Sequence, residues 1–159
     1  MDLYGWVVFV HAATILLFFI AHGTSMAVAF ALTRERDPAR VRALLDLSRF
    51  SLGAPAFASV IIGVLTGIAA AFMGDLWGEA WVWISLVLFV VIGGLMTPLG
   101  SLRLAPMRTA AGLAQSGPTP TEDPVELARL LDAWNPLPLA AAGFGGFVVI
   151  LWLMLAKPF

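Results

Sequence analysis

Two histidines are the residues of this 159-residue chain whose chemistry stands out, and the chain has no others. His11 and His22 lie in one apolar run without a formal charge. Eleven residues make close to three turns of an α-helix, so both imidazoles project from nearly the same face, about 16.5 Å apart along the axis. Thr14 and Ser25 lie close to this stripe, which is most economically placed against the interior of a helix bundle.

Three interpretations of the histidine stripe remain open. Each neutral imidazole could donate a hydrogen bond to a neighbouring helix and hold the helices together. One or both could ligate haem iron, in a haem b site, or copper, since imidazole suits both metals. A proton relay is the third interpretation, because histidine titrates near neutral pH, although no carboxylate lies in the same apolar run.

A metal site would need a second ligand, because His11 and His22 are too far apart to hold one ion. Methionines occur at matching depths: Met73 and Met154 near the level of His11, and Met96 near the level of His22. His/Met ligation is a known haem arrangement, but methionine in an apolar helix also serves as ordinary filler. The methionines are therefore candidate partners, and a haem held by one histidine or a site shared across a dimer stays open.

The composition places these residues in a membrane. Hydrophobic residues make up 60% of the chain, charged residues 12%, and the mean hydropathy is +0.94. Soluble domains are about half apolar and a quarter charged, so a soluble globular enzyme and a disordered chain are excluded. The net charge of −1 argues against nucleic acid as a partner, and the absence of cysteine excludes disulfides and thiolate sites. No P-loop, Ser/His/Asp set or H-E-x-x-H motif is present, which leaves open whether the protein is an enzyme.

Four apolar runs are long enough to cross a bilayer, at about 20 residues per crossing. We expect helices, because no open-edged sheet survives in hydrocarbon and the alternation of a membrane barrel is missing. The prediction is an all-α, four-helix transmembrane bundle that forms a single domain over residues 1–159. Its spans are expected at about 4–32, 53–73, 80–102 and 137–156.

The positive charges predict the orientation. Eight of the nine basic residues follow the first or the third span, whereas the connection between the second and third spans carries only the charges of Asp75 and Glu79. The positive-inside rule then places both termini outside and both long connections in the cytoplasm. Arginine outnumbers lysine by eight to one, which is typical of GC-rich bacterial genomes, so we expect a multi-pass protein of a bacterial inner membrane. Five tryptophans gather at the outer boundary: Trp6, Trp77, Trp81, Trp83 and Trp152.

The two basic connections resemble each other. Residues 37–46 read D-P-A-R-V-R-A-L-L-D and residues 123–132 read D-P-V-E-L-A-R-L-L-D. Asp followed by Pro is a common helix start, and Glu126 could complete a capping box with Asp123. Short cytoplasmic amphipathic helices are predicted at about 38–49 and 124–134, at the membrane surface or under the bundle. Either this start simply recurs, or a unit of span, short helix and span is duplicated as two parallel repeats.

Small residues in the second span predict close helix packing. Ser59, Gly63, Gly67 and Ala71 follow one another at four-residue steps. Such a groove lets two helix backbones approach closely. The partner helix can belong to the same chain or to a second copy in a homodimer.

The first span, W-V-V-F-V-H-A-A-T-I-L-L-F-F-I-A-H-G-T-S-M, and the following R-E-R-D-P-A-R-V-R resemble a known group. The chain looks like the small, uncharacterised bacterial four-helix integral membrane proteins. These are distantly similar to the copper-resistance D membrane domain and the J-type protoporphyrinogen oxidase, which also place a histidine early in the first span. The resemblance covers the first hairpin best, and it implies an association of His11 with haem.

Two functional hypotheses follow. The first is a haem- or copper-binding membrane protein with a redox or metal-handling role, using His11 and His22. The second is a cofactor-free protein: a small carrier of a lipophilic or small ligand, or an assembly or structural subunit of a membrane complex. The nearly charge-free interior would suit a lipophilic ligand between the two hairpins.

Overall fold

The structure is a computed structural model that describes residues 2–50, 53–113 and 117–159. Within these ranges it is all helical, which confirms the predicted fold class. Four helices are long and apolar enough to cross a membrane: α1 (Leu3–Ala31), α3 (Ala54–Met73), α4 (Ala80–Ala110) and α6 (Leu137–Ala156). The shorter elements are α2 (Pro38–Phe50), the 3-10 helix η1 (Leu76–Gly78) and α5 (Pro124–Asp132).

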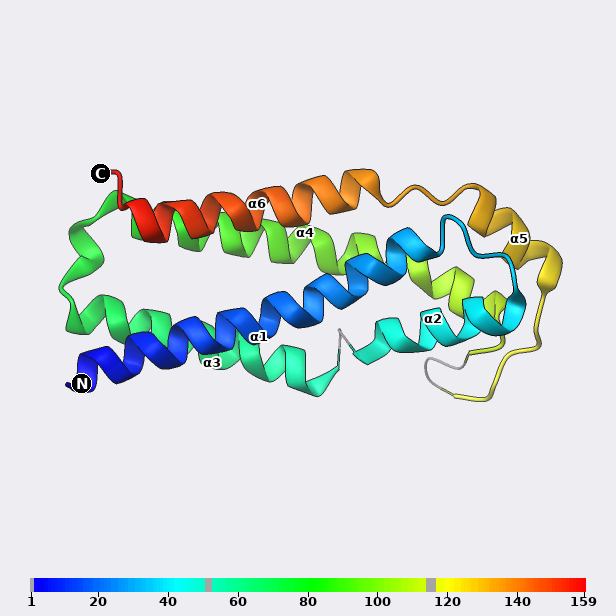
Figure 1. Ribbon diagram of the computed structural model, residues 1–159, viewed down its shortest axis with the longest axis horizontal. Helices are drawn as coiled ribbons and strands as arrows, with labels where there is room; N and C mark the ends of the chain where they lie inside the picture. The colour runs from blue at the N-terminus through cyan, green and yellow to red at the C-terminus, as the bar shows by residue number, and fades with distance from the viewer. Residues whose placement is uncertain (1, 51–52, 114–116) are drawn as a thin grey trace.

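The four long helices form two antiparallel hairpins. α1 packs along α3, and α4 packs along α6, with α2 and α5 inserted between the partners in the chain (Figure 1). Both chain ends lie at one end of the molecule, which we call the termini end, and α2 and α5 lie at the opposite, basic end (Figure 1). The order of long helix, short helix and long helix is the same in both halves, which is the order that a duplicated unit would give.

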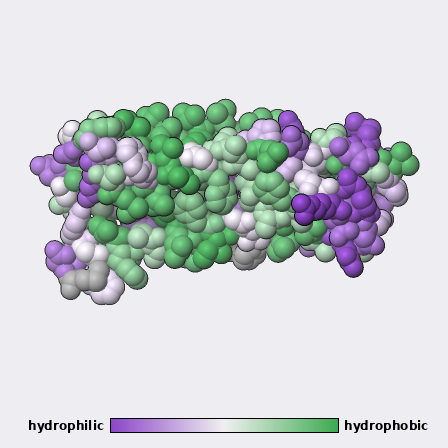
Figure 2. Space-filling model, turned by 45° about the horizontal axis from the view of Figure 1, so that its top comes forward, coloured by the Kyte–Doolittle hydropathy of each residue, from purple (hydrophilic) through white to green (hydrophobic). Residues whose placement is uncertain are grey.

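The surface of the long helices is apolar. Figure 2 shows hydrophobic residues over the middle of the molecule and hydrophilic residues at its two ends. Leu16, Leu65, Val90 and Leu155 are all at least 60% exposed. Exposing such apolar side chains to water is unfavourable, whereas exposing them to lipid tails is not. The apolar middle of the molecule therefore fits the hydrocarbon layer of a bilayer.

The small-residue groove of α3 is filled by α1. A Cβ at position 63 would lie 3.2 Å from the Ile15 side chain and 3.3 Å from Thr14 Oγ. A Cβ at position 67 would lie 2.9 Å from Cε1 of His11, closer than real contacts allow. The groove therefore serves packing within the chain, and glycine is needed at position 67.

The basic end has its own apolar core beneath the spans. α2 and α5 lie under the bundle, and their buried faces share one cluster with the ends of α1 and α4. α4 continues to Ala110, eight residues past the predicted end of the third span at about Leu102. The cluster contains Val28, Leu32, Val41, Leu45, Met107, Ala110, Ala111, Leu127, Leu131 and Trp134.

The predicted caps of the short helices are present in part. Asp37 accepts a hydrogen bond from the Arg40 backbone, and Asp123 accepts one from the Glu126 backbone at 3.0 Å. The reciprocal half of the capping box does not form. The Asp123 N–H donates to the Ala110 carbonyl, and the Glu126 carboxylate accepts two hydrogen bonds from Arg129 instead.

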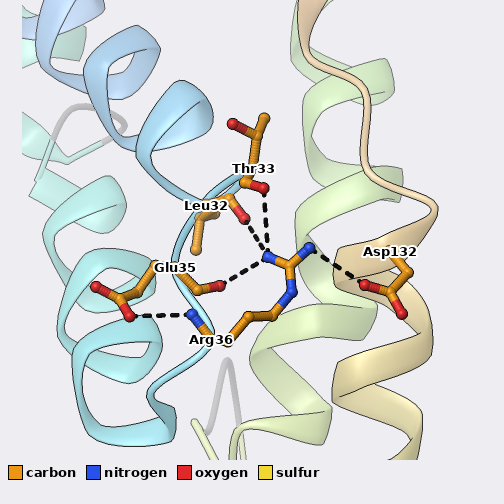
Figure 3. A network of polar contacts seen from close by, with 5 residues as sticks. All are labelled: Leu32, Thr33, Glu35, Arg36 and Asp132. Carbon is orange, nitrogen blue, oxygen red and sulfur yellow. Dashed lines mark hydrogen bonds and ion pairs between the residues drawn. The ribbon is translucent and has the colours of Figure 1, made fainter.

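Polar contacts join the two halves at the basic end (Figure 3). Arg36 donates to the carbonyls of Leu32, Thr33 and Glu35 and reaches Asp132 at 3.2 Å. A cation at the last carbonyls of α1 is also favoured by the helix dipole. The backbone N–H groups of Asp37 and Arg36 lower the pKa of the Glu35 carboxyl below its ordinary value.

A second connection between the halves comes from an indole. Trp134, which follows α5, donates from Nε1 to the Ala29 carbonyl of α1 at 2.8 Å. The indole is buried, at 8% exposed, within the apolar core of the basic end. This contact ties the second half of the chain to the last turn of the first span.

Candidate functional site

His11 is anchored to α3. Its Nδ1 lies 2.7 Å from the carbonyl oxygen of Gly63, and its ring covers Gly67. A carbonyl oxygen only accepts, so Nδ1 carries the proton and Nε2 keeps its lone pair. In the neutral ring this hydrogen bond between helices fixes the tautomer in which Nε2 carries no proton.

The polar stripe of α1 meets two different helices. Thr14 is buried, and its hydroxyl donates within α1 to the carbonyls of Val10 and His11. Whereas His11 and Thr14 face α3, the ring of His22 faces α6. Ser25 lies on α1 about one turn beyond His22. The face of α1 that carries both histidines therefore contacts α3 at His11 and α6 at His22.

His22 lies in a pocket of phenyl rings between the two hairpins. Phe18 stacks on the imidazole at 5.8 Å between ring centroids. Phe144 and Phe147 of α6 lie at 5.8 and 5.5 Å. Nε2 of His22 is buried and has no hydrogen-bond partner among the described residues. A buried polar atom without a partner is rare and calls for an explanation such as a bound ion or water.

Met96 reaches the same place from α4. A Cβ at position 143 of α6 would lie 3.2 Å from Nε2 of His22 and 3.6 Å from the Met96 sulfur. The nitrogen and the sulfur are therefore within about 7 Å of each other, the sum of these two distances. Glycine at 143 leaves the space that a side chain would fill. Three helices thus bring one imidazole nitrogen and one thioether sulfur together.

The other two candidate methionines lie elsewhere. Met73 ends α3 and is 43% exposed, six residues or about 9 Å along the helix from Gly67, which contacts His11. Met154 packs against the apolar cluster of Ile92, Phe147 and Ile150 between α4 and α6. Neither sulfur is placed by these contacts at a histidine nitrogen.

The donor set at His22 favours a soft ion of low coordination number. Thioether and imidazole suit Cu(I), whereas Cu(II) takes square-planar nitrogen and oxygen ligands and zinc takes four ligands. Among the described residues, no group of three His, Asp or Glu side chains converges as a metal site. Three phenyl rings surround the imidazole, and any of them that turns its face to a bound cation would attract it.

Two parts of this arrangement were missed by sequence reasoning. Gly143 belongs to a G-F-G-G run for which packing is the ordinary explanation, and its contact with His22 depends on the pairing of the hairpins. Arg108 is the second part. Because the predicted third span ends at about Leu102, the sequence places Arg108 in the connecting segment that follows the span. In the structure it is a buried residue of α4, at 7% exposed.

The apolar surface and the four long helices define a helical integral membrane protein. The chain matches the predicted integral membrane protein family DUF2269 over residues 6–158 and belongs to that family. The comparison with curated proteins found no match, and the comparison with solved structures found none either.

Proposed function

We propose that the protein binds copper(I) within the membrane, through Nε2 of His22 and the sulfur of Met96, in a metal-handling role. The observation that carries the proposal is the buried Nε2 without a partner among the described residues, within about 7 Å of a thioether from another helix. Both ligands are neutral, so the bound ion keeps its single positive charge. A phenyl ring of this cluster that presents its face to the ion would offset part of the cost of holding that charge in an apolar site.

A haem at the same nitrogen is disfavoured by the packing. The backbone of α6 at Gly143 and the rings of Phe144 and Phe147 lie against the imidazole. A porphyrin bound to Nε2 would need the space that these groups fill. The residues around His22 therefore fit a single ion better than a haem.

A haem on His11 is the second candidate function. The specific observation is the hydrogen bond from Nδ1 to the Gly63 carbonyl, the arrangement that usually orients a metal-bound histidine. It agrees with the haem association that the family resemblance implies for His11. A Soret band in protein from haem-replete cells, lost in His11→Ala and kept in His22→Ala, is the expected result for this function.

The copper proposal is tested by anaerobic titration with Cu(I) against a chromogenic chelator. The chain suits the experiment because it has two histidines and no cysteine, so an untagged sample in nanodiscs has little background. We expect one ion per chain, lost in His22→Ala. Loss of a residue that binds the ion directly should weaken copper binding at least as much as loss of a residue that only orients a ligand. We therefore expect Met96→Leu to bind copper about tenfold more weakly or worse.

Matched controls come from the same chain. His11→Ala and Met154→Leu remove the same two kinds of group outside the proposed site and should leave copper binding unchanged. Native affinity in His22→Ala would refute the copper proposal. If the chain then also lacks a Soret band, the cofactor-free carrier or assembly role takes its place.

A further inference from the structure

Arg108 is a buried charge at the basic end. Its side chain extends from α4 toward α2, where Nη2 donates to the hydroxyl of Ser48 at 2.6 Å. The residue is 7% exposed, Ser48 is 1% exposed, and the buried Nε has no hydrogen-bond partner among the described residues. A guanidinium has five N–H donors. Among the described residues, the Ser48 hydroxyl is the one acceptor that Arg108 contacts.

No carboxylate in the described residues neutralises this guanidinium through an ion pair. The charged groups that act on it electrostatically are Arg49, which disfavours its charged form, and Asp46, which favours it; both belong to α2. Asp46 already pairs with Arg49, at 3.8 Å. Because Asp46 and Arg49 compensate each other, the charge of the Arg108 guanidinium stays uncompensated by them. A buried charge without compensation is costly, so an anion is the expected complement.

The depth of Arg108 matches the headgroup layer of a bilayer. α4 has 31 residues and is about 46 Å long, whereas the hydrocarbon core is about 30 Å thick. The start of α4 carries Trp81 and Trp83, residues typical of the opposite interface. Arg108 is 28 residues further on, about 42 Å along the helix, and so lies where phosphate groups of the second leaflet are found.

We infer that Arg108 binds a phosphate group, supplied by an anionic phospholipid of that leaflet. Guanidinium matches phosphate through paired N–H donors, and Nε with a neighbouring Nη provides such a pair. Basic pockets between membrane helices are the usual sites for anionic headgroups. The Ser48 hydroxyl, which donates to the Leu45 carbonyl at 2.6 Å, fixes the orientation of the guanidinium.

The test measures lipid-dependent stability. Delipidated protein in mild detergent is titrated with phosphatidylglycerol, with phosphatidylcholine and with inorganic phosphate, and the melting temperature is followed. We expect phosphatidylglycerol to raise it more than phosphatidylcholine does. The same rise with inorganic phosphate alone would keep the phosphate site and assign its source to the free ion.

Two variants separate this site from general charge. Arg108→Gln should weaken the selective phosphatidylglycerol effect by about tenfold or more, because it removes charge-assisted hydrogen bonds. Arg103→Gln, an exposed residue of the same helix, removes the same charge and should keep the effect. An equal loss in both variants, or no preference for phosphatidylglycerol in the native chain, overturns the inference.

If Arg108→Gln does not fold, a conservative substitution at the same position provides the test. Arg108→Lys keeps the charge and removes the planar fork. Native mass spectrometry should then detect less co-purified phosphatidylglycerol than on the native chain. Equal retention by Arg108→Lys overturns the inference.

Discussion

Replacing Gly67 by alanine tests how α1 is seated on α3. The new Cβ would lie 2.9 Å from Cε1 and 3.1 Å from Nδ1 of His11. The ring cannot move aside freely, since Nδ1 is bonded to the Gly63 carbonyl at 2.7 Å. Overpacking of this kind costs about 1–3 kcal/mol. Loss of the hydrogen bond would add about 0.5–1.5 kcal/mol, and the higher helix propensity of alanine returns up to about 1 kcal/mol.

We therefore expect Gly67→Ala to be about 1–3 kcal/mol less stable than the native chain. Reversible unfolding by sodium dodecyl sulfate in mixed micelles, followed by circular dichroism, gives the free energy. Gly145→Ala is the matched control, because a Cβ at that position would contact nothing within 4 Å. It should be as stable as the native chain or slightly more so.

A double-mutant cycle isolates the contact between position 67 and the ring. In the His11→Ala background the imidazole is gone, so the added methyl group should cost little. The interaction energy should be of order 1 kcal/mol or more, as for residues in direct contact. An equal cost of Gly67→Ala with and without His11, or no cost in either, would refute the packing of α1 on α3.

Further predictions concern the ends of the molecule. Trp134→Phe removes the hydrogen bond to the Ala29 carbonyl, and melting in detergent should show a loss of about 0.5–1.5 kcal/mol. Because folding lowers the pKa of Glu35, its contribution to stability is complete above the ordinary value of 4.5 and is lost as pH falls through the lower folded pKa. Glu35→Gln should therefore flatten the melting temperature as a function of pH between about pH 5 and pH 3. The chain has no cysteine, so single cysteines report topology: Gly78→Cys should react with an impermeant reagent from outside, and Thr119→Cys should not. Reversed labelling would contradict the expected orientation.

Much of the fold is predictable from the sequence because the bilayer limits the choices. Apolar runs give the helices, and their lengths place the ends of α3 and α6 within a residue or so. α4 differs because charge marks the edge of the hydrocarbon but does not end a helix. The helix continues past Arg103 to Ala110, with Pro106 inside it, and Arg108 contacts Ser48 of α2.

The sequence predicts how deep in the membrane the candidate site residues lie, but not which helix each side chain faces. Helical spacing places His11 and His22 on one face, and residue counting places Met96 near the level of His22. Which helix each ring meets depends on how α1 passes from α3 toward α6, and periodicity carries no information on that. The contact of His22 with Gly143 joins residues far apart in the chain, and it requires the packed hairpins.

X-ray absorption spectroscopy of the copper-loaded protein tests the central claim most directly. Anaerobic protein with one equivalent of Cu(I), in nanodiscs, should show one imidazole nitrogen and one sulfur in the first shell of the ion. Met96→Leu should lose the sulfur, and Met154→Leu should keep it. No sulfur in the native spectrum, or a sulfur that persists in Met96→Leu, would contradict a copper site between His22 and Met96.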